Sequence, residues 1–503
     1  MSEESQASND ASLRRGSTRL FAAKVFFIGA GLVQQVLLPN TLGLAGYGLL
    51  SRVLAPMNVV NNVAVGASMQ NASRSTAAGA PPLATILRVQ IAIALAVVAA
   101  LVAAAPAVAS FQSAPAILAP LRLGAILCGL YVVYATLVGV VNGRQAFAAQ
   151  AGLDVTAATL RTAGLVGGGV LGARVLGSGP LGAVAGTVLA GAAMVAIATA
   201  LVKPRGLVAS RGEGAAIVLR SVAMLAGAQL VTNTLLQVDV VLLGRVFAVR
   251  GVPSVDADRA IGVYRACQLF SLLPYQLVAS VSLTLFPLVA KIHAEGSAED
   301  LRALVRRGLR LGVLLATILV GVVVAIPGPL LRLTFGHEVA ALGVHVLRPL
   351  AGAQALLVVG ALASTVLVAL GQTKRATLAG ASGLAVIGAG VLGAGPGPDA
   401  LRGMALWLAA GFGVQLILAF AFLLRTVPES LPLATFARAA LVVALAAELP
   451  SSPSGARMAA LALAPVAGAS VLAVLALAGE WTRADYTFMA NTLRQRLRRG
   501  ARP

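Results

Sequence analysis

The sequence predicts an all-α polytopic membrane protein with about 14 transmembrane helices. Of its 503 residues, 58% are hydrophobic and only 11% are charged, whereas roughly a quarter of the residues in a soluble domain are charged. The mean hydropathy is +0.91. The apolar residues also form long stretches, such as Ile91–Val108 and Leu461–Gly479. Stretches of about 18 or more residues with few charges are long enough to cross a bilayer as helices.

Fourteen such segments follow one another along the chain, separated by short polar loops. Small residues are frequent in them, as in Gly164–Gly172, because they let membrane helices approach closely. The predicted spans are 20–38, 48–70, 83–106, 117–141, 151–172, 180–202, 217–244, 261–290, 309–328, 342–370, 375–394, 402–424, 433–449 and 457–479.

The charges lie between the spans and predict their orientation. A net charge of +21 would suggest nucleic acid in a soluble protein, but here it follows the positive-inside rule, so we expect no nucleic-acid partner. With the N-terminus in the cytoplasm, 26 of the 38 Lys and Arg residues are counted on the cytoplasmic side and 11 on the outside, and Arg161 sits within a span. This bias predicts a multi-pass protein with both termini cytoplasmic. The stretch after the polar residues 1–19 contains Lys24 and is expected to be a retained first span.

The sequence offers no pattern for bond chemistry. The longest loops, near 203–216, 245–260 and 291–308, are too short to fold as domains. There is no phosphate-binding G-x-x-x-x-G-K-[ST] motif, and the three histidines are scattered. We therefore expect no catalytic residues, no cofactor and no metal site, and a transporter rather than an enzyme.

The two halves of the chain resemble each other. Gly46-Tyr47 followed by Pro56 corresponds to Gly262-Val263-Tyr264 followed by Pro274. Leu121-Arg122 at the start of span 4 likewise corresponds to Leu347-Arg348 at the start of span 10. A shift of six spans keeps the direction of the chain, which predicts two parallel bundles that rock about a site between them.

The repeat defines the predicted domains. They are a cytoplasmic tail (1–19), an N-terminal six-helix bundle (20–202), a cytoplasmic linker (203–216), a C-terminal six-helix bundle (217–424), two additional transmembrane helices (425–479) and a basic cytoplasmic tail (480–503).

Several of these segments carry a family resemblance. Leu42–Pro56 resembles the Gly-x-x-Gly-Tyr-Gly start of span 2 in polysaccharide flippases, and residues 239–264 resemble their Asp-led span 7 and Gly-x-Tyr start of span 8. Phe286-Pro287 and Ala369–Gln372 are similar as well. Over roughly residues 20–425 the chain resembles the multidrug/oligosaccharidyl-lipid/polysaccharide (MOP) exporter superfamily, in its polysaccharide flippase branch. Pro56-Met57-Asn58 before Gly66-Ala67 is also similar to the lipid II branch, but the basic residues of that branch are absent between them.

Amide side chains form stripes on two predicted helices. Asn58, Asn62, Gly66 and Gln70 recur every four residues in span 2, with Asn61 beside them. Gln229, Asn233 and Gln237 do so in span 7. Such spacing places each set on one helix face. Amides donate and accept hydrogen bonds, as a hydroxyl-rich sugar requires, although they also join helices to one another.

Four charged residues lie near the same region. Asp239 is a candidate for ion coupling or for a structural salt bridge. Arg52 and Arg265 occupy corresponding outer ends, and Lys24 lies near the inner end of span 1. The three cations are candidates either for holding a pyrophosphate or for reaching the membrane interface.

The resemblance implies that spans 1, 2, 7 and 8 line the central cavity. The predicted substrate-cavity residues are Lys24, Gln34, Arg52, Asn58, Asn61, Asn62, Gln229, Asn233, Gln237, Arg265 and Gln268.

The expected function is translocation of an undecaprenyl-pyrophosphate-linked oligosaccharide across the bacterial inner membrane, for surface polysaccharide or lipopolysaccharide biosynthesis. The expected partners are this lipid-linked oligosaccharide, membrane lipids, and a glycan polymerase or glycosyltransferases of the same pathway. A lipid II flippase and a cation-coupled multidrug antiporter of the same fold are the alternatives. A glycan polymerase would need a long periplasmic loop with paired catalytic residues, which the sequence lacks.

Overall fold

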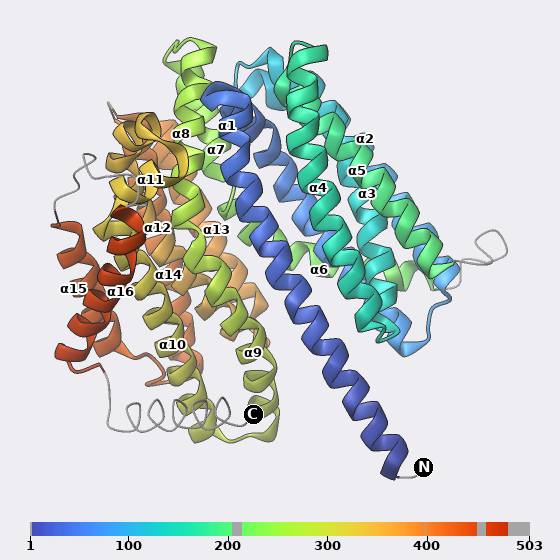
Figure 1. The fold of residues 1–503 in the computed structure, drawn as a ribbon. Coiled ribbons are helices and arrows are strands. Elements are labelled where there is room, and N and C mark those ends of the chain that lie inside the picture. Colours follow the sequence, from blue (N-terminus) through green and yellow to red (C-terminus); the bar gives the residue numbers. More distant parts are fainter. Residues whose placement is uncertain (1–2, 204–213, 398, 450–458, 481–503) are drawn as a thin grey trace, which may run out of the picture. The chain divides into compact units, whose positions relative to one another are not determined.

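In the computed structural model, the described residues are 3–203, 214–397, 399–449 and 459–480, and every regular element in them is a helix (Figure 1). The first part of the chain forms α1 (Glu3–Ala78), α2 (Leu83–Phe111), η1 (Pro115–Ile117), α3 (Leu118–Gly143), α4 (Phe147–Val175), α5 (Gly179–Val202), α6 (Ala215–Leu235), α7 (Val238–Val249) and α8 (Ser254–Ser271). The second part forms α9 (Leu273–Glu295), α10 (Ala298–Ala325), α11 (Pro327–Phe335), α12 (His337–Ala369), α13 (Thr373–Ala389), η2 (Gly390–Ala394), α14 (Ala400–Thr426), α15 (Leu433–Ala447) and α16 (Ala459–Leu477).

These helices confirm the predicted fold class. The first two predicted spans are the two halves of α1, which bends at Gly43, where φ is 71° and ψ is 168°. Among the described residues, nine helices are long and apolar enough to cross a membrane. The other five predicted spans correspond to the two halves of α1, to α4 and to the shorter apolar helices α15 and α16. The short helix α11 lies between predicted spans 9 and 10.

Two predicted spans are interrupted. Span 7 is α6 followed by α7, with Leu236 and Gln237 between them, and span 8 is α8 followed by α9, with Leu272 between them. At the first break, the Asp239 carboxylate accepts a hydrogen bond from the Val240 amide and so satisfies a donor in the first turn of α7. At the second, Pro274 lies in the first turn of α9, where its missing N–H costs nothing. Broken helices are typical of substrate-binding regions in transporters.

The chain forms two compact units, and each is described by itself. Unit 1 comprises Met1–Leu269 and Leu384–Trp407, and unit 2 comprises Phe270–Gly383 and Leu408–Pro503. The predicted division into two six-helix bundles rests on the sequence repeat and stays a prediction.

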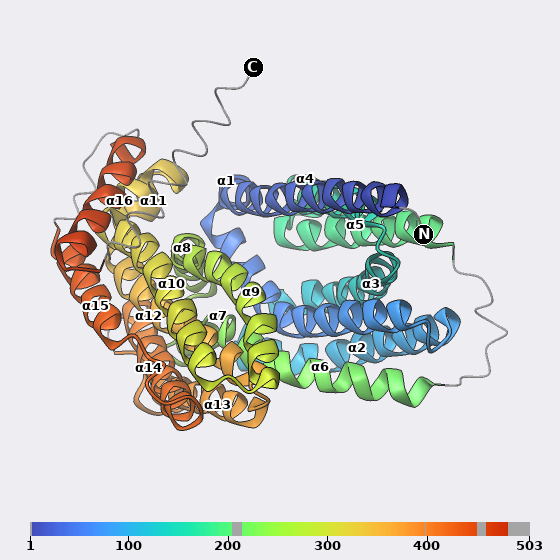
Figure 2. The same cartoon turned by 90° about the horizontal axis from the view of Figure 1, so that it is seen from below.

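In unit 1, close helix packing depends on glycine. Figures 1 and 2 show α4 lying along α5. A Cβ atom on Gly168 of α4 would lie 2.4 Å from the carbonyl oxygen of Gly182 in α5, and one on Gly182 would lie 2.3 Å from the carbonyl oxygen of Gly168. The two backbones therefore touch where no side chain fits, as small residues allow in membrane helices.

In unit 2, a buried apolar core joins α9, α10, α12, α13 and α14. Its fully buried members include Val289, Leu309, Val366 and Leu423. α15 and α16 pack against α10 through Leu314, Val442 and Val471 (Figures 1 and 2).

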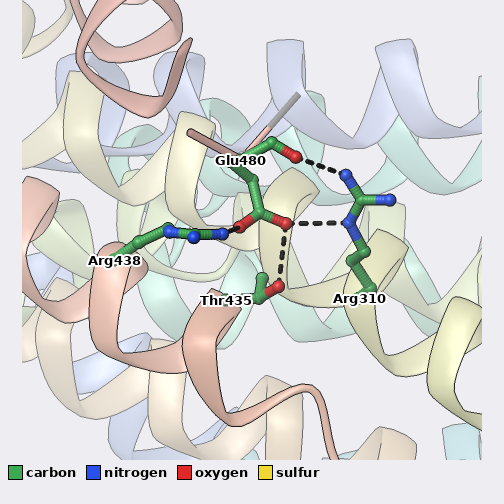
Figure 3. A network of polar contacts seen from close by, with 4 residues as sticks. All are labelled: Arg310, Thr435, Arg438 and Glu480. Atoms are coloured by element: carbon green, nitrogen blue, oxygen red, sulfur yellow. Dashed lines mark hydrogen bonds and ion pairs between the residues drawn. The ribbon is translucent and has the colours of Figure 1, made fainter. Parts of the chain in front are cut away.

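A buried carboxylate also fixes the end of α16 within unit 2. Glu480 follows α16 and is only 2% exposed. One of its carboxylate oxygens accepts hydrogen bonds from Nε of Arg310 and from the Thr435 hydroxyl, both at 2.8 Å, and the other accepts one from Nη1 of Arg438 at 2.8 Å (Figure 3). Three elements, α10, α15 and the segment after α16, therefore meet at one side chain.

Candidate substrate-binding site

Arg52 is held by acceptors within unit 1. Its Nη1 lies 2.7 Å from Oδ1 of Asp258 in α8. Its Nε donates to Oε1 of Gln112 at 3.1 Å, and its Nη2 donates to the Gln112 carbonyl oxygen at 2.7 Å. The residue is 2% exposed. All three nitrogens of the guanidinium group are thus engaged, and Arg52 connects α1, α8 and the residue after α2.

The same helices cross at two glycines of the repeated motif. A Cβ atom on Gly48 would lie 1.7 Å from the carbonyl oxygen of Asp258, and one on Gly262 would lie 2.2 Å from the carbonyl oxygen of Leu44. The Gly-Tyr-Gly motif of α1 and the Gly-Val-Tyr motif of α8 therefore lie directly against each other. This crossing brings the Arg52 guanidinium within reach of Asp258.

Asp239 is the centre of a second buried network in unit 1. It is 1% exposed, and it accepts hydrogen bonds from the Val240 amide at 2.8 Å, the Tyr264 hydroxyl at 2.9 Å and Nε2 of Gln268. Oε1 of Gln268 in turn accepts a hydrogen bond from Nη1 of Arg265 at 2.7 Å. Three of the predicted site residues, Asp239, Arg265 and Gln268, are therefore connected.

The network extends to α1 through Tyr47. Arg265 interacts with the Tyr47 side chain, and the Tyr47 hydroxyl donates a hydrogen bond of 2.7 Å to Oε1 of Gln35. Arg265 is half-buried, in contrast to Arg52, which is 2% exposed.

The two amide stripes meet at Gly66. A Cβ atom on Gly66 of α1 would lie 2.4 Å from Oε1 of Gln229 in α6, so the amide of Gln229 occupies the space that the glycine leaves. Nδ2 of Asn233 donates to the backbone oxygen of Gln229 at 2.9 Å. Asn58 and Asn61 are half-buried, and Asn62 is exposed. The structure thus brings the stripe of span 2 against the stripe of span 7.

Three amides of the predicted set carry a buried oxygen without a hydrogen-bond donor among the described residues. They are Gln34, Asn61 and Gln237. A buried acceptor without a donor costs roughly 1–3 kcal/mol, which is offset when a ligand supplies the donor. For Lys24 only the backbone, within α1, is described; its side chain lies outside the described part of the structure.

Sequence reasoning did not find Asp258 or Gln112. Asp258 falls in a segment predicted to be a loop, and Gln112 follows a helix of 29 residues. Only the contact between α1 and α8 reveals their role. Arg161 was visible in the sequence as a cation within a span, but it had no predicted partner.

A family model described as polysaccharide biosynthesis protein matches residues 37–341. The chain belongs to this family. Three solved structures show its fold. The lipid II flippase MurJ in an inward closed conformation has 13% identity and a TM-score of 0.68, with 91% of this chain and 98% of MurJ covered.

The second structure is an inward-facing multidrug resistance MATE family transporter of the MOP superfamily. It has 14% identity and a TM-score of 0.63, covering 82% of this chain and 94% of the transporter. The third is a MOP superfamily transporter from Pyrococcus furiosus described as having a binding pocket of reverse polarity, with 16% identity, a TM-score of 0.54 and coverages of 83% and 96%. A search of curated proteins found no match.

The chain therefore belongs to a polysaccharide biosynthesis family and has the fold of a lipid II flippase and of a MATE family transporter of the MOP superfamily, which agrees with the predicted resemblance. The three structural neighbours are a flippase and two transporters. At these identities, however, the solved structures establish the fold alone.

Proposed function

We propose that this protein is a flippase for an undecaprenyl-pyrophosphate-linked oligosaccharide. It would move this molecule across the bacterial inner membrane by alternating access, for surface polysaccharide or lipopolysaccharide biosynthesis. The family match supports the pathway, and the fold shared with a lipid II flippase supports the type of transport. The observation that carries the proposal is the meeting of the amide stripes of α1 and α6 at Gly66 and Gln229.

The amides suit the sugar part of such a substrate. The buried oxygens of Gln34, Asn61 and Gln237 have no donor among the described residues, and sugar hydroxyls are donors that match them. Amide nitrogens beside these oxygens supply the complementary donors. A drug with a large apolar surface would leave the same oxygens without a partner.

The cations suit the pyrophosphate. Arg265 is half-buried and offers a planar fork for phosphate oxygens. Arg52, whose three guanidinium nitrogens are engaged, contributes to the site by holding α1 against α8. An inside-negative membrane potential assists outward movement of an anion by about 2.3 kcal/mol per charge per 100 mV.

Asp239 is our candidate for ion coupling. It is a buried carboxylate at a helix break, and such residues often belong to ion pathways. Its three hydrogen bonds, from Val240, Tyr264 and Gln268, also fit a structural role. Asparagine preserves the shape of Asp239 but not its charge. Loss of transport in Asp239→Asn would therefore support ion coupling, and full transport would support a structural role.

The alternatives differ in what they require of the site. A cation-coupled multidrug antiporter of the same fold requires several acidic residues in its cavity, whereas the predicted set contains Asp239 alone. A lipid II flippase is expected to carry basic residues between the Pro56–Asn58 and Gly66-Ala67 segments of span 2, where this chain has Asn61 and Asn62. Both alternatives are tested by the phenotype of a deletion strain.

We propose that both termini face the cytoplasm and that a glycan polymerase or glycosyltransferases of the same pathway act beside the flippase. The charge bias of the loops supports this orientation. Fusions of a cytoplasmic and a periplasmic reporter to each terminus test the orientation directly.

The decisive experiment for the function is deletion of the gene. We expect lipid-linked oligosaccharide to accumulate on the cytoplasmic face and surface polysaccharide to be lost, with both restored by the wild-type gene. Accumulation of lipid II would support the first alternative, and unchanged glycans with increased drug sensitivity would support the second.

A further inference from the structure

Arg161 is a cation at the middle of a membrane helix. It lies fourteen residues from either end of α4, which spans Phe147–Val175. A charged side chain at this depth is costly, and such residues usually face a bundle interior or mark a path for substrate or ions. Neither the amide stripes nor the Asp239 network accounts for Arg161.

The contacts of Arg161 show which side of α4 it occupies. Its guanidinium carbon lies 4.6 Å from the centroid of the Phe27 ring in α1. A Cβ atom on Gly31, one turn further along α1, would lie 3.7 Å from Nη2 of Arg161. Figures 1 and 2 show α1 lying alongside α4 within unit 1. The guanidinium group therefore lies between α1 and α4, over an aromatic face that favours a cation.

No acceptor among the described residues balances this charge. Nε of Arg161 is buried without a hydrogen-bond partner in the described part of the chain. Asp154 lies on the same face of α4, but seven residues, or about 10 Å along the helix axis, separate the two.

Two hydroxyl groups near Arg161 in the fold are also without a described partner. Tyr131 of α3 interacts electrostatically with Arg161, and its hydroxyl is buried without a partner among the described residues. The hydroxyl of Thr162, the next residue of α4, is also buried without a described partner. Arg161 as a whole is half-buried.

The geometry points to an anion site formed by Arg161 and Tyr131, which takes a phosphate group of the transported headgroup. Guanidinium N–H and phenol O–H groups are donors that phosphate oxygens accept in charge-assisted hydrogen bonds. Mid-membrane depth is where transporters of this architecture hold substrate. The assignment to the headgroup rests on the proposed function, whereas the anion site itself does not.

The test uses the full-length protein in nanodiscs and measures its melting temperature in the presence of ligand. The probes are inorganic pyrophosphate and a short-chain prenyl pyrophosphate. Two probes are needed because the phosphate group that binds could belong to a free anion or to a lipid headgroup. We expect both probes to raise the melting temperature of the wild type. In Arg161→Gln we expect binding to weaken by about tenfold or more, since a charge-assisted hydrogen bond is lost.

The matched control is Arg174→Gln, which removes an exposed arginine from the last turn of the same helix. It should bind both probes as the wild type does. Tyr131→Phe removes only the hydroxyl and should weaken binding by a smaller factor. Arg161→Lys keeps the charge without the fork and should fall between wild type and Arg161→Gln, so the proposal stays testable if Arg161→Gln does not fold.

A structural role predicts a different pattern. If Arg161 only joined helices, Arg161→Gln would lower the melting temperature without ligand and leave the ligand-induced shift unchanged, which would overturn the site. A second outcome would overturn the assignment to the headgroup. In it, Arg161→Gln would weaken the binding of inorganic pyrophosphate but leave the binding of prenyl pyrophosphate unchanged.

The proposed function fails independently of this site. If the deletion strain makes normal glycans, the function is wrong even when purified protein binds pyrophosphate through Arg161. If Arg161→Gln restores glycan export fully in the deletion strain and binds both probes normally, only the anion site is wrong.

Discussion

Nη1 of Arg52 in α1 lies 2.7 Å from Oδ1 of Asp258 in α8, and the two residues are 206 positions apart in the sequence. Both side chains are largely buried, and the pair lies beside the crossing of Gly48 and Gly262. Removing one partner of a buried ion pair leaves an uncompensated charge, which costs about 3–5 kcal/mol.

We therefore expect Arg52→Ala and Asp258→Ala each to lower the melting temperature in detergent markedly, and the double variant to lose less than the sum of both. The exposed pair Arg302–Glu429 in unit 2 is the control, because exposed pairs contribute roughly 0–1 kcal/mol. Additive effects of Arg52→Ala and Asp258→Ala would show that the pair is not coupled.

The glycine crossing gives a second prediction. In Gly48→Val, the side chain would collide with the backbone of Asp258, which cannot move aside as a side chain does. We expect little folded protein, measured as the monodisperse fraction in size-exclusion chromatography. Gly152→Val in α4, where a Cβ atom meets nothing within 4 Å, is the matched control. Equal yields of both variants would contradict the close crossing.

The Asp239 network gives a third prediction. If Asp239 couples transport to an ion, Asp239→Asn should fold and yet lose glycan export and its dependence on the ion gradient. Tyr264→Phe, which removes one hydrogen bond to Asp239 and keeps its charge, should retain most export. Full export by Asp239→Asn would rule out coupling through this residue.

The contact between the stripes gives a fourth prediction. Gly66→Leu would displace the Gln229 amide from its position against α1. We expect reduced glycan export at normal membrane abundance, measured by complementation of the deletion strain with an immunoblot for protein level. Gly227→Leu, two residues before Gln229 in α6 and in open space, should export normally. A normal level of export by Gly66→Leu would show that the contact between the two amide stripes is not needed for transport.

Glu480 gives a prediction about pH. Burial raises its pKa, but hydrogen bonds from Arg310, Arg438 and Thr435 outweigh this effect, so that its pKa lies below the ordinary value of 4.5. Because the folded pKa is lowered, the carboxylate stabilises the protein fully above the unfolded pKa, and this contribution is lost as pH falls through the folded pKa.

We therefore expect the melting temperature of the wild type to fall as the pH drops below about 5, where carboxylates of ordinary pKa also titrate. Glu480→Gln should already be less stable at pH 7 and should lose less on acidification. Glu429→Gln, which removes an exposed carboxylate, should follow the wild type. Identical pH profiles for Glu480→Gln and wild type would contradict the network.

The sequence by itself determined the helical membrane fold and its approximate spans, because the length and charge of apolar stretches depend on the bilayer and not on the partners of each helix. It also placed the amides on helix faces, since helical periodicity is local. The repeated Gly-Tyr motifs could also be recognised from the sequence, because a repeat is a likeness between two segments and needs no contact between them.

Only the tertiary structure decided which of these residues meet. Arg52 was expected in the substrate cavity, whereas its guanidinium group is engaged by Asp258 and Gln112, which come from distant parts of the chain. The break after Leu235 was missed because it contains neither proline nor glycine and depends on the Asp239 side chain. The partners of a polar side chain are set by helix crossings such as that of Gly48 and Gly262, and a crossing is a property of two helices that no single stretch of sequence contains.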